Sequence, residues 1–320
     1  MNHGFWKQLK KPFFILAPMA DVTDWPFRQI VAQCGRPDVF FTEFVSADGL
    51  ASEKGREKLL PMLHYTEDER PVVAQIFSAR PENIHTTARL VCDLGFDGLD
   101  INMGCPDRKV VKQGAGIALS KTPELAKKIV ATARDGATGL PVSVKTRLGF
   151  DQIDMRWIKT LLELKLSALS IHLRTMRELS SVPAHWDVMT EIAQLRNKIS
   201  PETLLIGNGD IITHAKALEK VSQCGIEGIM IGRGIFYNPW FFDTNRDQNS
   251  VTPEQRLQLL VDHIEKFDQF WGSKKNFDVL KRFFKIYISG WDGAKELRAT
   301  LMNTKSVREA LDVVTKYRMS

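Results

Sequence analysis

The sequence predicts an α/β protein in which a (β/α)8 TIM barrel is followed by a small all-helical domain. Three observations predict it: eight short apolar segments recur along the chain, segments of helical periodicity separate most of them, and the C-terminal part carries helical periodicity alone. Eight strands joined by helical crossovers fit a closed parallel barrel better than an open doubly wound sheet. We expect the barrel domain at residues 1–245 and the helical domain at residues 246–320.

The expected strands are short runs of apolar residues bounded by turn signals. Thr122-Pro123-Glu124 is typical of the helix starts between them, since a capping hydroxyl precedes a first-turn proline and an acid. Gly95 and Gly225 are placed to end helices in the left-handed conformation. In chain order the strands are expected at residues 13–18, 39–45, 72–77, 98–102, 142–146, 168–172, 204–208 and 228–232.

Beyond residue 249 the pattern is helical throughout. Thr252-Pro253-Glu254-Gln255 is a capping box with proline at the first helical position, and apolar residues follow it at helical spacing. Three further helices are expected at residues 279–288, 294–302 and 306–314. We therefore expect a small helical bundle, with its boundary to the barrel within residues 242–250.

The composition excludes several classes of protein. No apolar run approaches the roughly 20 residues of a membrane span, and the N-terminus lacks the apolar core of a signal peptide. The four cysteines are scattered without a C-x-x-C pair, which argues against a zinc site and against a disulfide scaffold. We expect a cytoplasmic monomer that binds neither a membrane nor a metal.

The positive charge of the chain is concentrated in its C-terminal part. The net charge is +6, and residues 274–320 hold 11 Lys/Arg against 5 Asp/Glu, so the preceding 273 residues hold 33 of each. A basic appendage on a neutral body is typical of an enzyme that binds a polyanion, although a lysine-rich solvated helix face is also common.

Polar and charged residues follow the expected strands at the point where each strand ends. The chemistry of such barrels gathers at this rim, and a buried strand would not tolerate so many donors and charges unless they met a ligand or each other. Gln75 alone could be a satisfied core amide and His172 a structural histidine, but the joint pattern favours a functional site. These residues are Pro18, Met19, Ala20, Thr42, Glu43, Gln75, Asn102, Cys105, Lys145, Arg147, His172, Arg174, Asn208, Gly209, Asp210, Gly232, Arg233 and Gly234.

Two of these groups have features of particular chemistry. Asn102 and Cys105 come where the fourth strand ends, so an amide and a thiol reach one rim; taken alone, Cys105 is as readily a small buried hydrophobe as a reactive cysteine. Asn208-Gly209-Asp210 and Gly232-Arg233-Gly234 follow the seventh and eighth strands, where backbone N–H groups commonly hold a phosphate.

The motifs that run along the whole chain from Phe13 resemble, as a set, those of the tRNA-dihydrouridine synthases. The C-terminal segments Lys285-Ile286-Tyr287 and 293–298 fit the family's helical domain. The sequence departs from common forms of the family at Asp107-Arg108 and in the loop 178–186. The motifs are Ala17-Pro18-Met19-Ala20, Ala74-Gln75-Ile76, Asp100-Ile101-Asn102-Met103-Gly104-Cys105-Pro106, Lys145-Thr146-Arg147, His172-Leu173-Arg174, Gly207-Asn208-Gly209-Asp210 and Gly232-Arg233-Gly234.

The resemblance implies an FMN-bearing barrel that uses NADPH to reduce the C5–C6 double bond of selected uridines in tRNA to 5,6-dihydrouridine. The isoalloxazine ring would rest on Pro18, Met19 and Ala20. Gln75 and Lys145 would hydrogen-bond the ring edge, and His172 would lie beside it. The phosphate would be held by Asn208, Gly209, Gly232 and Arg233, and Asp210 completes the expected set of cofactor-binding residues.

The resemblance also assigns the substrate side. Asn102 and Arg147 would bind the target uracil, and Cys105 would be the acid that protonates C5 after hydride reaches C6. A thiol with an ordinary pKa of about 8.5 stays mostly protonated at neutral pH, which suits that role. The uridine would have to be flipped into the pocket, and the basic helical domain would contact the RNA phosphates. The candidate residues for these contacts are Lys274, Lys275, Lys281, Arg282, Lys285 and Arg298.

Two other functions remain open from the residues. Another FMN barrel oxidoreductase acting on a small pyrimidine or enone, such as a dihydroorotate dehydrogenase, would not need a basic appendage. A phosphate-binding barrel without flavin, or an RNA-binding protein with a decayed site, would purify colourless.

Overall fold

The computed structural model of this chain describes residues 2–246 and 250–319. Its sheet has eight parallel strands in the order β1-β8-β7-β6-β5-β4-β3-β2. All eight strands expected from the sequence are confirmed, with bounds shifted by two residues at most. They are β1 Phe13–Leu16, β2 Phe40–Ser46, β3 Val72–Phe77, β4 Gly98–Met103, β5 Val142–Arg147, β6 Ala168–His172, β7 Leu204–Asn208 and β8 Gly228–Ile231.

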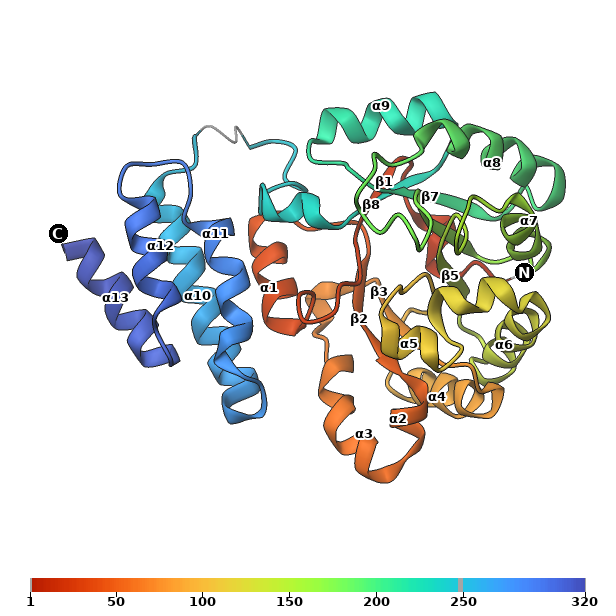
Figure 1. Ribbon diagram of the computed structural model, residues 1–320, viewed down its shortest axis with the longest axis horizontal. Coiled ribbons are helices and arrows are strands. Elements are labelled where there is room, and N and C mark those ends of the chain that lie inside the picture. Colours follow the sequence, from red (N-terminus) through yellow and green to blue (C-terminus); the bar gives the residue numbers. More distant parts are fainter. Residues whose placement is uncertain (1, 247–249, 320) are drawn as a thin grey trace. The chain divides into compact units, whose positions relative to one another are not determined.

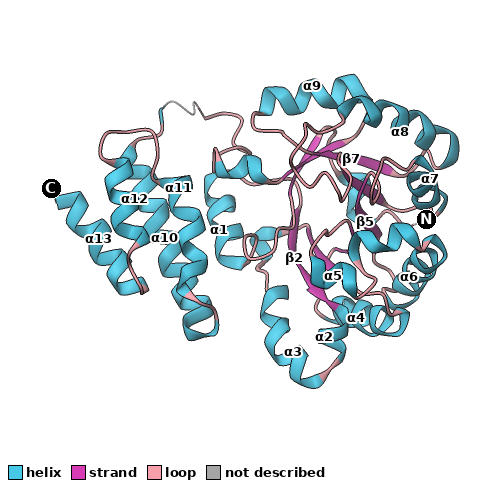
Figure 2. Ribbon diagram, in the orientation of Figure 1, coloured by secondary structure: helices cyan, strands magenta, loops and turns pink. Residues whose placement is uncertain are grey.

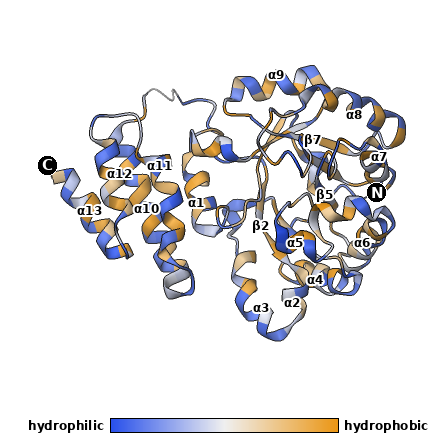
Figure 3. Ribbon diagram, viewed as in Figure 1, coloured by the Kyte–Doolittle hydropathy of each residue, from blue (hydrophilic) through white to orange (hydrophobic). Residues whose placement is uncertain are grey.

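The two ends of this sheet meet and close it into a barrel. A parallel bridge joins Ile15 of β1 to Val39, directly before β2. The amide of Leu16 donates to the carbonyl of Val39 at 3.4 Å. Figure 2 shows the strands inside a layer of helices, and β7 is largely orange, that is hydrophobic, in Figure 3. The (β/α)8 barrel predicted from the sequence is therefore confirmed.

The barrel helices begin and end at residues that the sequence marks. Proline occupies the first turn of α4 and of α6. Gly225 caps α9 in the left-handed conformation with φ +65°. Thr122 does precede α6, but its side chain makes no capping hydrogen bond. The helices are α2 Ala47–Ala51, α3 Glu53–Leu59, α4 Pro81–Asp93, α5 Arg108–Lys112, α6 Pro123–Gly136, α7 Met155–Glu163, α8 Trp186–Ile199 and α9 His214–Cys224.

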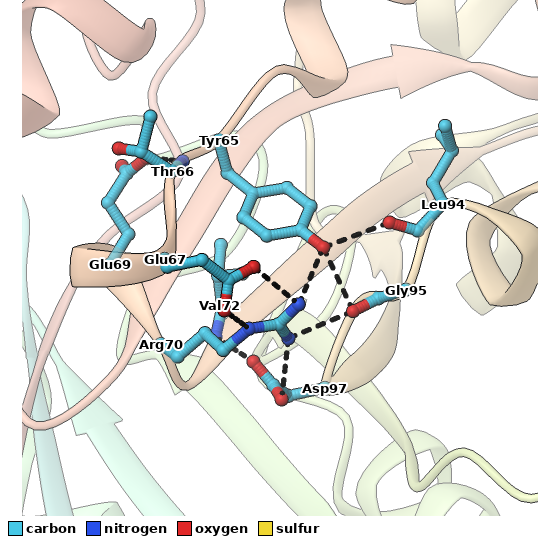
Figure 4. Close-up of polar contacts among 9 residues, drawn as sticks. All are labelled: Tyr65, Thr66, Glu67, Glu69, Arg70, Val72, Leu94, Gly95 and Asp97. Atoms are coloured by element: carbon cyan, nitrogen blue, oxygen red, sulfur yellow. Dashed lines mark hydrogen bonds and ion pairs between the residues drawn. The ribbon is translucent and has the colours of Figure 1, made fainter.

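One arginine, Arg70, anchors the segment before β3 through several hydrogen bonds (Figure 4). The Arg70 guanidinium donates to the carboxylate of Asp97 and to the carbonyl of Gly95, each at 2.9 Å, and to the hydroxyl of Tyr65 at 2.9 Å. Asp97 also accepts from the amide of Val72 at 2.8 Å. These contacts join the segment before β3 to the turn between α4 and β4, so they fix where both strands begin.

The chain packs as two compact units. One is Met1–Thr23 with Pro37–Gly232, and the other is Asp24–Arg36 with Arg233–Ser320. Helix α1, Trp25–Cys34, thus packs with the C-terminal helices although it follows β1 in the chain. Residues 247–249, within the expected boundary region, lie outside the described residues. The assignment of domains to residues 1–245 and 246–320 stays a prediction.

The second unit consists of helices, as its sequence predicts (Figure 1). The helix expected at residues 279–288 is instead a 3-10 helix, Phe277–Phe283, followed by a short α-helix. Leu280 and Phe283 are both buried, and their spacing of three places them on one side of a 3-10 helix. The α-helices after residue 250 are α10 Pro253–Trp271, α11 Phe284–Tyr287, α12 Ala294–Met302 and α13 Val307–Met319. Within the described residues no helix is long and apolar enough to cross a membrane.

A histidine lies in the core of this unit. His263 is fully buried, and its ring centre lies 5.6 Å from that of Phe27 and 4.7 Å from that of Phe283. Its Nδ1 is 2.9 Å from the Tyr287 hydroxyl, and its Nε2 has no hydrogen-bond partner among the described residues. Burial lowers the pKa of His263 to about 4, because a charged ring would lose its hydration there.

This burial predicts that the second unit loses stability in mild acid. The unfolded chain binds a proton at His263 near pH 6.5 but the folded chain only near pH 4, so stability is complete above about pH 6.5 and falls toward pH 4. Between about pH 7.5 and about pH 5, we expect the titration of His263 to lower the free energy of unfolding by about 2 kcal/mol. Urea unfolding of the whole chain at both pH values measures this decrease.

His263→Asn is the matched variant, since its side-chain amide can hydrogen-bond the Tyr287 hydroxyl as donor or acceptor but does not titrate. The variant should have a lower free energy of unfolding than the wild type at the higher pH. On acidification its free energy of unfolding should fall by less than that of the wild type. An unchanged pH dependence in the variant would show that His263 is not the group responsible.

Candidate active site

The barrel brings the polar residues of the predicted site to the carboxyl ends of neighbouring strands. Asn102 lies opposite Lys145 in the register of β4 and β5, and His172 lies opposite both Arg147 and Asn208. Gln75 lies opposite Asp100, which is two residues before Asn102 on β4 and therefore deeper in the barrel. The expected residues Arg233, Lys281, Arg282 and Lys285 belong to the second compact unit, where Arg233 begins the 3-10 helix Arg233–Phe236.

A chain of hydrogen bonds leads from the barrel interior to the Cys105 turn. The carboxylate of Asp100 accepts from the Ser143 hydroxyl at 2.6 Å and from the Gln75 amide at 2.7 Å. Gln75 accepts from the Asn102 amide at 2.9 Å. The Asn102 side-chain oxygen then accepts from the backbone amide of Cys105 at 2.8 Å. A buried carboxylate thus orients the residue that shapes the cysteine turn.

Cys105 is held at the end of β4 with its side chain nearly enclosed. It is 8% exposed, and its carbonyl accepts from the amide of Ile117 at 3.2 Å. Gly116 has φ +61°, and a Cβ there would lie only 2.7 Å from the Cys105 carbonyl oxygen. Burial raises the pKa of the Cys105 thiol above its ordinary value, and the nearby Arg147 and Lys145 oppose the shift without reversing it. Cys105 is therefore a protonated thiol at neutral pH.

Arg147 fixes two loops at once. Its Nε donates to the carbonyl of Gly104, directly before the cysteine, at 3.0 Å. Its Nη1 donates to the carbonyls of Thr175 and Leu179, each at 3.1 Å. The predicted uracil ligands Asn102 and Arg147 therefore both contact the backbone around Cys105. Their contact with uracil stays a prediction.

The loop after β6, in which the sequence departs from common family forms, is stabilised by contacts within the loop itself. Glu178 accepts from the amide of Thr175 at 2.7 Å and lies 2.9 Å from Nε2 of His185. Leu179 in the same loop has φ +51° and is 51% exposed. The loop is thus ordered by Glu178 within it and by Arg147 below it.

Lys145 and Asp100 form the charged centre of the rim. Burial, assisted by the neighbouring Arg147, lowers the pKa of Lys145 to about 8. Burial raises the pKa of Asp100 to about 6, although its hydrogen bonds to Ser143 and Gln75 and the charge of Lys145 act in the opposite direction. Perturbed pKa values of this kind gather at functional sites.

The residues expected at a phosphate lie around the ends of β7 and β8. The Asn208 amide donates to the carbonyl of Met230 at 2.7 Å. A Cβ built on Gly232 would have no neighbour closer than 3.8 Å, and its nearest atoms belong to Ala17, Met19 and Asn208. The backbone of Gly232 is therefore open on the side that Met19 and Asn208 line. Asp210, in contrast, accepts from Arg174 and from the amide of Ala184.

Asp100, Ser143 and Arg174 are each buried beside the predicted site. Arg174 was expected at the rim from the sequence but without a specific role, and Asp100 and Ser143 were not expected there. The signal for Asp100 was its spacing of two from Asn102, which places both side chains on the same face of a strand. Ser143 and Lys145 have the same relation on β5. No local signal shows that Arg174 reaches across to Asp210. Among the residues that the structure describes, no group of three or more His, Cys, Asp or Glu side chains could hold a metal ion.

The fold and this rim define a (β/α)8 barrel with a buried protonated thiol and two cations at the carboxyl ends of its strands. Residues 15–319 match the family model described as "Dihydrouridine synthase (Dus)". The chain is 44% identical over 320 residues to the "Probable tRNA-dihydrouridine synthase" of Staphylococcus aureus (strain COL), covering 99% of this chain and 96% of that one. The chain belongs to the dihydrouridine synthase family.

A second relative and two solved structures agree with the family and with the fold. The chain is 45% identical over 312 residues to the "Probable tRNA-dihydrouridine synthase 2" of Bacillus subtilis (strain 168), covering 97% of this chain and 95% of that one. Morphinone reductase in complex with tetrahydroNAD matches with a TM-score of 0.51 at 12% identity, over 76% of this chain and 88% of that chain. A 2-naphthoyl-CoA reductase matches with a TM-score of 0.55 at 10% identity, over 76% and 52%. At these identities the two structures support the fold alone.

The packing around Cys105 predicts that Gly116→Ala destabilises the protein more than a positive φ alone explains. The new methyl group would meet the Cys105 carbonyl at 2.7 Å and Val110 at 2.9 Å. Gly225→Ala is the matched control, because φ is +65° there and nothing lies within 4 Å of the added Cβ. Both variants should lose about 1 kcal/mol through the left-handed backbone, and Gly116→Ala should lose about 1–3 kcal/mol more. Equal shifts of the urea midpoint in the two variants would contradict this account.

Proposed function

We propose that this protein uses FMN and NADPH to reduce the C5–C6 double bond of specific uridines in tRNA to 5,6-dihydrouridine. Its membership of the family and the names of its two relatives support the reaction. The observation that carries the chemistry is the Cys105 thiol, which burial keeps protonated at the end of β4. A reduction of this type needs a proton donor at C5, and Cys105 is the candidate.

The residues at the rim fit a flavin mononucleotide. The open backbone at Gly232, next to Met19 and Asn208, leaves room for a group that approaches closely. Gln75 on β3 and Lys145 on β5, the two strands that flank β4, offer an amide and a cation, as the polar edge of a flavin ring requires. When bound, the flavin would supply hydride that originates from NADPH. The proposed cofactor set is the one named from the sequence, with Pro18, Met19 and Ala20 below the ring and Arg233 and Asp210 completing the phosphate side.

The protein's own residues would then complete the reaction. Asn102 and Arg147 would bind uracil while holding the turn that carries Cys105. Lys145 and Arg147 place positive charge where negative charge develops on the uracil as it accepts hydride. The Cys105 Sγ would give its proton to C5, and Asn102 sets its position through the 2.8 Å hydrogen bond to the Cys105 amide.

The second unit offers a basic surface for RNA phosphates. Arg282 and Lys285 are exposed, whereas Lys281 pairs with Asp278 at 2.7 Å. The same unit has a recess of about 670 Å³ whose lining includes Lys305 and Arg308 as well as Asp268 and Asp312. Lys305 and Arg308 extend the RNA-binding set proposed from the sequence, whereas Lys275, which that set includes, pairs with Asp24 at 3.1 Å. The cytoplasmic location and the monomeric state stay predictions.

The proposed activity is tested by incubating the purified protein with NADPH and unmodified tRNA transcripts and locating dihydrouridine by mass spectrometry of nuclease fragments. We expect a gain of two hydrogens at defined uridines. The rate should fall steeply with added salt, because each phosphate contact releases counterions on binding. A yellow protein that oxidises NADPH without modifying tRNA would instead favour a flavin enzyme of small molecules. A colourless protein would favour a phosphate-binding barrel or a decayed site.

Cys105→Ala tests the proton donor. The variant should retain bound flavin and oxidise NADPH, because the thiol is not needed for either, but should form dihydrouridine at least about 100-fold more slowly. Cys92→Ala is the control: Cys92 is a half-buried thiol of α4 whose Sγ lies 3.9 Å from the carbonyl of Gly136. Normal product formation by Cys105→Ala would remove the assignment of Cys105 as the acid.

A further inference from the structure

Arg174 is a buried arginine next to the predicted site, and each of its three nitrogen positions has a different partner. It is 2% exposed and follows β6 directly. Its Nε donates to the carbonyl of Val182 at 2.6 Å, and its Nη2 donates to the carboxylate of Asp210. Its Nη1 lies 3.1 Å from Nε2 of His172. One guanidinium thus joins the end of β6, the loop after it and the turn after β7.

The contact with His172 has only one chemical solution. A guanidinium carries donors and no acceptor, and it stays protonated in proteins. Nε2 of His172 must therefore be the acceptor, so it carries no hydrogen. A neutral imidazole has one ring N–H, and that hydrogen must then be on Nδ1. A charged imidazole would bring its own Nε2–H against the guanidinium N–H.

We propose that Arg174 is a positioning residue that holds His172 as the neutral Nδ1–H tautomer. The guanidinium cannot easily turn away, because Val182 and Asp210 occupy its other two sides. Asp210 supplies the negative charge that a buried guanidinium requires. Asp210 is itself fixed by the amide of Ala184 at 2.8 Å and holds φ at +54°, a conformation that costs free energy in a residue other than glycine.

This tautomer decides what His172 can offer a ligand. Nδ1 is a donor, so any contact that this atom makes with a ligand must be to an acceptor, and the ring adds no charge to a rim that already holds Lys145 and Arg147. If the proposed function holds, His172 would therefore face an acceptor atom of the flavin ring. The tautomer itself follows from the protein contacts and does not depend on that function.

The tautomer is measured by NMR of the whole chain labelled with [15N]histidine, without cofactor. Two-bond correlations between ring protons and ring nitrogens distinguish a protonated nitrogen from an unprotonated one, and the loss of signals in His172→Gln assigns His172. We expect wild-type His172 to show a protonated Nδ1 and an unprotonated Nε2. In Arg174→Met the donor at Nε2 is gone, so this single pattern should be lost in favour of a mixture of protonation states.

Arg196→Met is the matched control. Arg196 is 4% exposed and also pairs with a carboxylate, at 2.9 Å from Glu227, and with a carbonyl, that of Thr203 at 2.6 Å. The Arg196→Met variant should lose stability much as Arg174→Met does, because it also removes a buried arginine. The NMR pattern of His172 should stay unchanged in it.

Two results would overturn the proposal: a hydrogen on Nε2 of His172 in the wild type, or an unchanged pattern in folded Arg174→Met. If Arg174→Met does not fold, the wild-type spectrum still decides, since only an unprotonated Nε2 is compatible with the proposal. No activity enters the measurement, so failure of the proposed reaction and failure of this inference are distinguishable.

Discussion

The carboxylate of Asp100 has no access to solvent, and the polar rim of β3, β4 and β5 is ordered around it. A buried charge must be compensated by hydrogen bonds, and Ser143 and Gln75 provide them. Gln75 is thereby oriented so that its oxygen accepts from Asn102, whose own oxygen shapes the turn at Cys105. The position of the thiol thus depends on a carboxylate that never needs to touch a ligand.

Buried arginines perform the corresponding task for the loops. Arg147 binds backbone carbonyls on the cysteine turn and on the loop after β6, and Arg174 binds a carbonyl of that same loop and the turn after β7. Loops at the rim of a barrel have few apolar contacts to hold them, so multidentate hydrogen bonds to carbonyl groups replace packing. Arg147 and Arg174 therefore hold the loops of this rim in place, in addition to any contact that they make with a ligand.

In the second unit, aromatic side chains and one buried carboxylate join α1 to the C-terminal helices. Phe27 of α1 packs against Phe283, and Trp271 donates to the buried carboxylate of Asp24 at 2.8 Å. Asp24 also accepts from the amide of Phe27 as the cap of α1 and pairs with Lys275 at 3.1 Å. Asp24, which caps the first helix after β1, thus also joins that helix to the C-terminal helices.

The sequence by itself determined the eight strands, their parallel arrangement and the rim at which their polar ends gather. Apolar runs of that length with helices between them have few other ways to bury both faces of a sheet. It also placed Asn102, Cys105, Lys145, Arg147 and His172 at that rim. It could not show that helix α1 packs with the C-terminal helices, because packing between distant segments leaves no local pattern.

Only the tertiary structure decided what each polar side chain contacts. The sequence predicts Asp210 beside a phosphate from its neighbours in the chain, but it does not show the contact of Asp210 with Arg174, 36 residues away. That contact depends on the side-by-side placement of β6 and β7. Hydrogen-bond direction and tautomer likewise follow from which groups meet in space, and the order of residues in the chain does not specify that.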